Sequence, residues 1–343
     1  MTKLNSKKLL LSMASAAAIF VGGINTSSAG SNVGNTLTGA VTAGTADLAL
    51  TENHALCAFG GAGLLTAHPN ITLPKGKFSF IAGANTLSSD AASTFAPVDG
   101  SDISFVGAST INFGAGFWTQ PTSGAVTYQL RGSGAVTLPD TALADAVTGF
   151  ELFINAYTAT TLTRASAGTL HATMNIIGNL TVGAEITALG GRLLGTGVLT
   201  LDATTVAVNC AYDKSFAGRI VTGAATVFES LPEKGMLSIQ TGGFTVNSAS
   251  KLGTLEVLSG TPTINATKSL TIKLLDLTDV AGATTIALGS SDANVIIEQI
   301  APGSTGSLVI TGTGSKAKLT VLKGALAAGI TYSGFSGTVK LPA

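Results

Sequence analysis

An apolar, polar, apolar triplet recurs along the chain, as in Leu255-Glu256-Val257 and Leu270-Thr271-Ile272. Successive side chains of an extended chain point to opposite faces, so each triplet puts two large apolar side chains on one face. Gly, Ser, Thr, Asn and Ala fill the roughly 5–15 residues between triplets, and this spacing predicts short strands joined by turns in an all-β chain. Similar triplets, four of them with Ala, Val or Ile in the middle, lie at 180–182, 199–201, 206–208, 237–239, 244–246, 275–277, 286–288, 295–297, 308–310, 319–321, 330–332 and 339–341.

Three all-β architectures could use such strands. A β-sandwich closes after about seven to nine strands, and this pattern continues beyond that number. A transmembrane barrel needs strands of about ten residues and aromatic girdles, whereas aromatic residues make up 6% of this chain. A solenoid needs very short strands and small residues at its corners, with each coil burying its apolar side chains against the previous coil. The sequence therefore predicts a right-handed parallel β-helix, although no single repeat length can be read from it.

The regular pattern predicts a β-solenoid over residues 169–343. Residues 30–168 are also rich in β-type sequence but are less regular, and we expect them to form the first coils or a cap. The stretch 139–157 is the one candidate for a short helix, with Asp140 or Thr141 as its N-cap.

Residues 1–29 are typical of a secretory signal peptide. Lys3, Lys7 and Lys8 precede an apolar segment at 9–24, and the small residues Ser27 and Ala29 allow a cut after Ala29. The apolar segment is short and interrupted by Ser and Gly, which argues against a membrane span. We therefore expect an exported protein with no transmembrane segment in the mature chain.

The composition limits the classes of partner that this chain can bind. Charged residues make up only 10% of it, against about 25% in average proteins, and the formal net charge is zero. A chain without an excess of positive charge does not attract nucleic acid or anionic lipid electrostatically. Zero net charge also removes the repulsion that keeps copies apart, so self-association is favoured.

Cys57 and Cys210 are the two cysteines. An exported chain could pair them in a disulfide. Both lie in strand-like apolar sequence, so two buried, unpaired thiols are the other possibility.

Candidates for catalysis or metal binding are few. Two pairs of carboxylates, Asp99 with Asp102 and Asp276 with Asp279, could bind calcium or act as acid and base on a β-helix face. Asp is also a common turn residue, because its side chain bonds to nearby backbone. His54 and Cys57 form half of a metal motif with no second half. The sequence therefore predicts no catalytic residue, no metal site and no cofactor.

Two loops are candidate interaction sites. Phe117 and the single tryptophan, Trp118, lie in a loop punctuated by Gly and Pro, where aromatic side chains could contact a partner or a carbohydrate. A second loop concentrates polar and charged residues in a chain that has few, namely Tyr212, Asp213, Lys214 and Arg219.

The last strand is a further candidate for contact. A β-helix that ends at 338–341 leaves an edge and an open apolar face at Val339 and Leu341, which Pro342 can cover only in part. We expect end-to-end self-association, or docking onto another envelope or host surface component, through this coil.

A signal sequence followed by Gly-, Thr-, Ala- and Asn-rich short-strand repeats with few cysteines resembles the passenger region of bacterial autotransporters. It is similar in style to the surface antigens of rickettsia-like alphaproteobacteria. Those proteins usually end in a translocator barrel, and nothing after Val339 could form one. The resemblance implies a non-enzymatic adhesin or structural component at the bacterial cell surface or outer membrane, or in the extracellular space. The alternative is a secreted polysaccharide lyase or hydrolase on the same scaffold, which would gather charged groups in a groove.

Overall fold

The fold is defined by a computed structural model that describes most of the chain after residue 93. The described residues are 94–342, apart from 108–109, 114–117, 120, 144–148, 203, 206, 279, 281, 289–292 and 327. Before residue 94 it describes the backbone of the short strands at 48–49, 57–59, 63–65, 70–72, 77–82 and 87–89.

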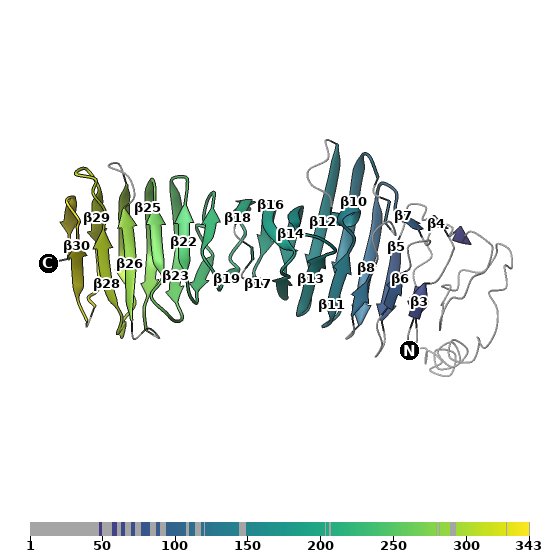
Figure 1. Cartoon of the computed structure of the whole chain (residues 1–343), viewed down its shortest axis with the longest axis horizontal. Coiled ribbons are helices and arrows are strands. Elements are labelled where there is room, and N and C mark those ends of the chain that lie inside the picture. The colour runs from purple at the N-terminus through teal and green to yellow at the C-terminus, as the bar shows by residue number, and fades with distance from the viewer. Residues whose placement is uncertain are drawn as a thin grey trace, which may run out of the picture.

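The described strands form a β-solenoid built on two 14-stranded parallel sheets, here called sheet 1 and sheet 2. Each coil adds one strand to each sheet, and the coils stack in a row (Figure 1). Sheet 1 contains β2 (Cys57–Phe59), β5 (Lys77–Ala82), β8 (Ser101–Gly107), β10 (Gly124–Leu130), β12 (Phe150–Ala156), β14 (Gly168–Ile176), β16 (Ile186–Gly195), β18 (Ala207–Tyr212), β20 (Thr226–Phe228), β22 (Gly243–Val246), β24 (Thr263–Ala266), β26 (Ala283–Leu288), β28 (Ser307–Thr311) and β30 (Ile330–Ser333). Sheet 2 contains β3 (Gly63–Leu65), β6 (Leu87–Ser89), β9 (Ile111–Asn112), β11 (Ala135–Leu138), β13 (Thr160–Arg164), β15 (Asn179–Val182), β17 (Val198–Leu201), β19 (Arg219–Thr222), β21 (Met236–Ile239), β23 (Ser250–Val257), β25 (Ser269–Asp276), β27 (Asn294–Ile300), β29 (Lys318–Val321) and β31 (Thr338–Lys340).

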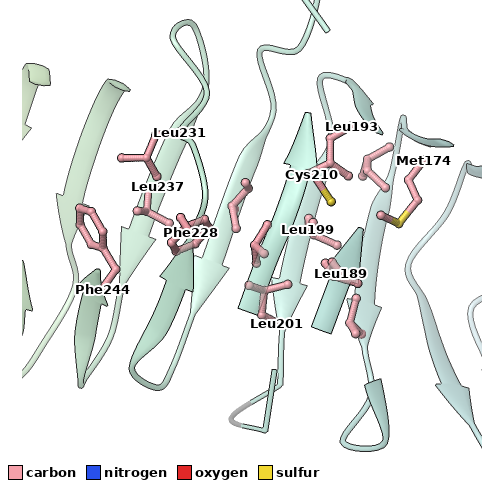
Figure 2. Packing of buried hydrophobic residues seen from close by; sticks show 14 of the residues in the cluster. Met174, Leu189, Leu193, Leu199, Leu201, Cys210, Phe228, Leu231, Leu237 and Phe244 are labelled. Atoms are coloured by element: carbon pink, nitrogen blue, oxygen red, sulfur yellow. The ribbon is translucent and has the colours of Figure 1, made fainter. Parts of the chain in front are cut away.

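The apolar positions of the triplets face the interior, as the sequence predicts. In β25, Leu270 and Ile272 are fully buried, whereas Thr271 between them is half-buried and faces outward. Buried side chains from successive coils form one continuous core that runs from Phe95 to Val321. Figure 2 shows part of it, with side chains of several coils meeting between the strands. Each fully buried Leu, Ile, Val or Phe contributes about 1.5–3 kcal/mol, so the stack of coils is the main source of stability.

The length of a coil varies, which explains why the sequence shows no single period. Ile220 pairs with Leu237 in the next coil, and Val126 pairs with Leu152, so a coil takes between 17 and 26 residues. The strands stay in register because the extra residues lie in the corners. Each coil therefore keeps apolar residues at its inward positions, while the number of residues in its corners differs from coil to coil.

Some corners require glycine. Gly243 begins β22 with a φ of 87°, and a Cβ at this position would lie 1.9 Å from the carbonyl oxygen of Thr263. An L-residue would meet both a strained backbone and a clash with the next coil.

The N-terminal coils have a third side. A three-stranded parallel sheet joins β1 (Leu48–Ala49), β4 (Asn70–Thr72) and β7 (Thr94–Ala96), and an isolated bridge from Phe95 to Trp118 continues it. The two long sheets run without a break through the boundary at 168 and 169. The helix considered for 139–157 is a short 3₁₀ segment, η1 (Asp140–Leu143), and Phe150–Ala156 is strand β12. The alternating burial of β12 outweighs a helical pattern here, because its apolar residues fill the coil interior.

The topology rules out a disulfide between the two cysteines of one chain. Cys57 lies in β2 and Cys210 in β18, with six strands of sheet 1 between them. At about 4.8 Å per strand, they are roughly 34 Å apart, far beyond the reach of a disulfide. Cys210 is a free, buried thiol, and burial raises its pKa from 9.0 to about 12.

In the described part of the chain, no helix has the length and apolar character of a membrane span.

Candidate functional site

Trp118 belongs to the core rather than to a surface loop. Its side chain is 1% exposed, and its ring centroid lies 4.4 Å from that of Phe95 and 5.5 Å from that of Tyr128. The hydroxyl group of Tyr128 donates a hydrogen bond to the carbonyl oxygen of Ala142, 2.9 Å away in η1. The expectation of an exposed aromatic contact at Trp118 is therefore not met, because the rings fill the wide N-terminal coils. Phe117 lies outside the described residues.

The second candidate loop forms a corner after β18. Asp213 accepts hydrogen bonds from the backbone and hydroxyl groups of Ser215, at 2.8 and 2.6 Å, and pairs with Arg192 of the previous coil. The Ser215 hydrogen bonds, with the charge of Arg192, lower the pKa of Asp213. The Tyr212 ring lies 5.6 Å from Phe216, and burial raises the pKa of its hydroxyl group. These contacts fix the corner, and Lys214 is exposed beside them.

Arg219 is separate from that corner and lies on the outer face of sheet 2. Its Nε donates to Ser238 Oγ at 2.7 Å, and its Nη2 donates to Glu256 Oε2 at 2.5 Å. Ser238 Oγ also donates to Glu256 Oε2, at 2.6 Å. The three residues connect β19, β21 and β23. The structure therefore separates Arg219 from Tyr212, Asp213 and Lys214 and gives it a role in joining coils.

A second group of charges lies near this one. The carboxylate of Glu233 forms ion pairs with Lys273, at 3.5 Å, and with Lys251, at 3.8 Å. All three side chains are more than 40% exposed, so the ion pairs are weak. They connect a corner to two neighbouring strands of sheet 2.

The predicted carboxylate pairs are mainly turn structures. Asp99 Oδ1 accepts from the backbone N–H of Ala125 in the next coil, at 2.8 Å. Asp276 Oδ1 accepts from the backbone N–H of Thr278, at 3.0 Å. Asp102 lies within β8 rather than in a turn, and Asp279 lies outside the described residues.

The histidines and metal candidates give no assembled site. His171 is exposed on the outer face of sheet 1, and His54 and His68 lie outside the described residues. Among the side chains that the structure describes, no three of His, Cys, Asp and Glu gather as a metal would require.

The last described coil has an open apolar side, as the sequence predicts. Ile330 and Val339 are half-buried, and Tyr332 and Leu341 are 50% and 46% exposed. Their partners one coil earlier, Leu308, Ile310 and Leu319, are fully buried. These inward positions of the last coil would be buried only if another coil or another chain packed against its open side.

Sequence reasoning missed a broad polar surface on the outside of sheet 1. It extends over β8, β10, β12 and β14, where strands are seven to nine residues long. The outward side chains form two rows along the solenoid axis, because the strands pair in parallel register. We call these eight residues the outer platform: Asp102, Thr127, Phe153 and Thr173 in one row, and Ser104, Gln129, Asn155 and Asn175 in the other.

An aromatic edge borders the outer platform. Tyr157 directly follows β12 and is 37% exposed, and the guanidinium carbon of Arg131 lies 4.6 Å from its ring centroid. Ile177, after β14, is 47% exposed. The sequence did contain a signal for this surface. The outward positions of these strands carry larger side chains, such as Gln, Asn and Phe, whereas the outward positions of later strands carry mainly small residues. It emerges only when neighbouring coils are aligned.

No protein-family model matches the chain, and neither a curated protein nor a solved structure does.

Proposed function

We propose that this chain is an exported, non-enzymatic β-solenoid of the bacterial cell surface, where it acts in adhesion or as a structural component of the envelope. The observation that carries the proposal is the long stack of coils around one continuous core. Thirteen strand-to-strand steps in sheet 1, at about 4.8 Å each, give a stack roughly 60 Å long. Such a stack can hold binding surfaces away from an anchoring point.

Two features of the chain support export and a surface role. The N-terminal 29 residues have the order of a signal peptide, with basic, apolar and small-residue regions. The exported repeat-rich composition resembles autotransporter passengers, whose function is commonly contact with other surfaces. The low charge content fits a protein that associates with surfaces or with itself rather than with nucleic acid.

The charged groups in the described coils favour this role over polysaccharide cleavage. Arg192 with Asp213, Arg219 with Glu256, and Glu233 with two lysines form ion pairs that connect coils. A lyase or hydrolase needs acid and base groups that face a bound sugar and keep free positions for proton transfer. Ion pairing occupies the charged groups named here, which makes these groups less suited to acid–base catalysis.

Export and surface exposure can be tested in a bacterial host that carries the full chain. N-terminal sequencing of envelope or secreted protein should begin at Gly30, and added protease should digest the protein on intact cells. Leu10→Arg, which places a charge in the apolar region, should leave the precursor inside the cell. An intact Met1 on protein recovered from the envelope, or protection from protease on intact cells, would remove the proposal.

A further inference from the structure

The last described coil leaves one edge of each long sheet unpaired. β30 pairs only with β28, and β31 pairs only with β29, among the strands that the structure describes. Alternate backbone N–H and C=O groups of an edge strand point away from the sheet and can pair with another strand. Tyr332 and Leu341 add exposed apolar surface at the same end. A partner at this end must therefore supply both hydrogen-bonding strands and apolar side chains.

These requirements favour a protein partner over a lipid layer. A hydrocarbon layer could cover Tyr332 and Leu341, but it would leave the edge groups of β30 and β31 without hydrogen bonds. Such unsatisfied backbone groups are costly in an apolar layer.

The opposite end of the solenoid offers suitable strands. β2 pairs only with β5, and β3 pairs only with β6, so each long sheet has a second free edge at the far end of the row of coils (Figure 1). β2 and β3 have three residues each, and β30 and β31 have four and three. A second copy stacked in the same direction would extend both sheets with parallel strands of similar length.

Charge differs between the two ends of the chain. Residues 30–107, up to the end of β8, contain five carboxylates and two lysines. Residues 299–343, which include the last two coils, contain no Asp or Glu and four lysines, namely Lys316, Lys318, Lys323 and Lys340. The two ends therefore have net charges of opposite sign, although the whole chain is neutral.

The lysines of the last coils are available to a partner. Lys318 and Lys340 are exposed on the outer face of sheet 2, and the register makes them diagonal neighbours on β29 and β31. None of the four lysines forms an ion pair with a described residue. Contact between two C-terminal ends would bring like charges together, whereas the acidic end of a second copy would attract them.

We propose that the C-terminal coil of one copy binds the N-terminal coils of a second copy, so that the copies form a head-to-tail filament. Strand pairing continues both long sheets across the junction, and the four lysines set its direction. A head-to-tail contact leaves a free end on every oligomer, so growth is open-ended. This inference deepens the proposed function and rests on it for its biological setting, because it gives a structural component of the envelope a means of assembly.

Sedimentation of the purified chain over a range of protein and salt concentrations tests the proposal. We expect a series of oligomers that extends beyond the dimer and shrinks as salt is added, because salt screens the attraction between the ends. Lys318→Glu with Lys340→Glu should weaken association by about tenfold or more. The circular dichroism should stay unchanged, since both side chains are exposed.

Lys214→Glu with Lys268→Glu is the matched control. It makes the same change in net charge at exposed corner positions of earlier coils, and it should weaken association far less.

A mixing experiment tests the direction of the stack. The chain with Lys318→Glu and Lys340→Glu keeps its N-terminal end, so it should bind the C-terminal end of an unmodified chain and stop growth there. Adding it to unmodified chain should therefore lower the mean oligomer size.

Several results would overturn the proposal. They are an unmodified chain that stays monomeric at low salt, a series that stops at the dimer, association that Lys318→Glu with Lys340→Glu leaves intact, and equal loss in the control. Monomers that bind vesicles of phosphatidylcholine and phosphatidylglycerol would also overturn it, in favour of a lipid surface. These measurements use purified protein, so they can fail while the export and protease tests succeed, and the reverse.

Discussion

Arg219 and Glu256 are joined by a 2.5 Å contact although a whole coil lies between their strands. The arginine extends along the axis past β21 and meets the carboxylate on β23, and Ser238 on β21 bonds to both. Both charged side chains are partly exposed, at 37% and 22%, which limits the strength of the pair. The contact therefore connects three successive coils of the stack.

We therefore expect Arg219→Met and Glu256→Gln each to lower the free energy of unfolding modestly. A double-mutant cycle should give a coupling of about 1 kcal/mol or less, falling as salt is added. Urea unfolding at low and high salt measures it. A coupling of zero at low salt would show that the contact does not join the coils energetically.

Ile272→Asp should unfold the neighbouring coils, because it places an unpaired charge in a fully buried position. Thr271→Asp is the matched control, since Thr271 is the next residue and faces outward. Circular dichroism and thermal unfolding of the two variants compare the faces directly. Equal damage at both positions would contradict the one-sided burial of β25.

Trp118 provides a spectroscopic test of the N-terminal core, because it is the single tryptophan. Its fluorescence should be blue-shifted and resistant to a soluble quencher. Trp118→Ala should lower the free energy of unfolding by about 3–5 kcal/mol. Tyr157→Ala, at an exposed aromatic, should cost far less. A red-shifted, readily quenched emission in the folded protein would place Trp118 at the surface after all.

Stability should fall as pH rises above about 9. The buried Cys210 thiol keeps its proton until about pH 12, whereas the unfolded chain loses it near 9.0. The folded state therefore binds more protons across this interval, and one such proton changes stability by up to about 1.4 kcal/mol per pH unit. Tyr128 and Tyr212 act in the same direction, because burial raises the pKa of both hydroxyl groups.

Urea unfolding across this pH interval measures the decline, and Cys210→Ala should reduce its slope. A slope unchanged by that substitution would show that the thiol does not contribute.

The open side of the last coil should promote self-association through Val339 and Leu341. Replacing both with lysine should reduce association and leave the circular dichroism unchanged, because neither position is fully buried. Thr263→Lys with Thr285→Lys adds the same charge at outward positions and should have less effect. Sedimentation at several protein concentrations measures the oligomeric state. An unmodified chain that stays monomeric at every concentration would contradict this prediction.

The sequence by itself determined which face of each strand is buried. The alternation of Leu270, Thr271 and Ile272 is a local property, since every second side chain of an extended strand points the same way. The fold class followed, because many short one-sided strands with small corner residues have few ways to bury their apolar faces. The helix considered near Asp140 was the exception, because a short apolar stretch fits either period.

Only the tertiary structure decided which outward residues become neighbours. Coils vary between 17 and 26 residues, so sequence spacing does not reveal that Gln129 lies beside Ser104 and Asn155, or that Arg219 reaches Glu256. Only the arrangement of the coils shows that Trp118, which lies in a loop-like sequence, is part of the core. The same arrangement places Cys57 and Cys210 many strands apart. Burial within a strand is set by local geometry, whereas contacts between coils depend on corner lengths that small residues leave free.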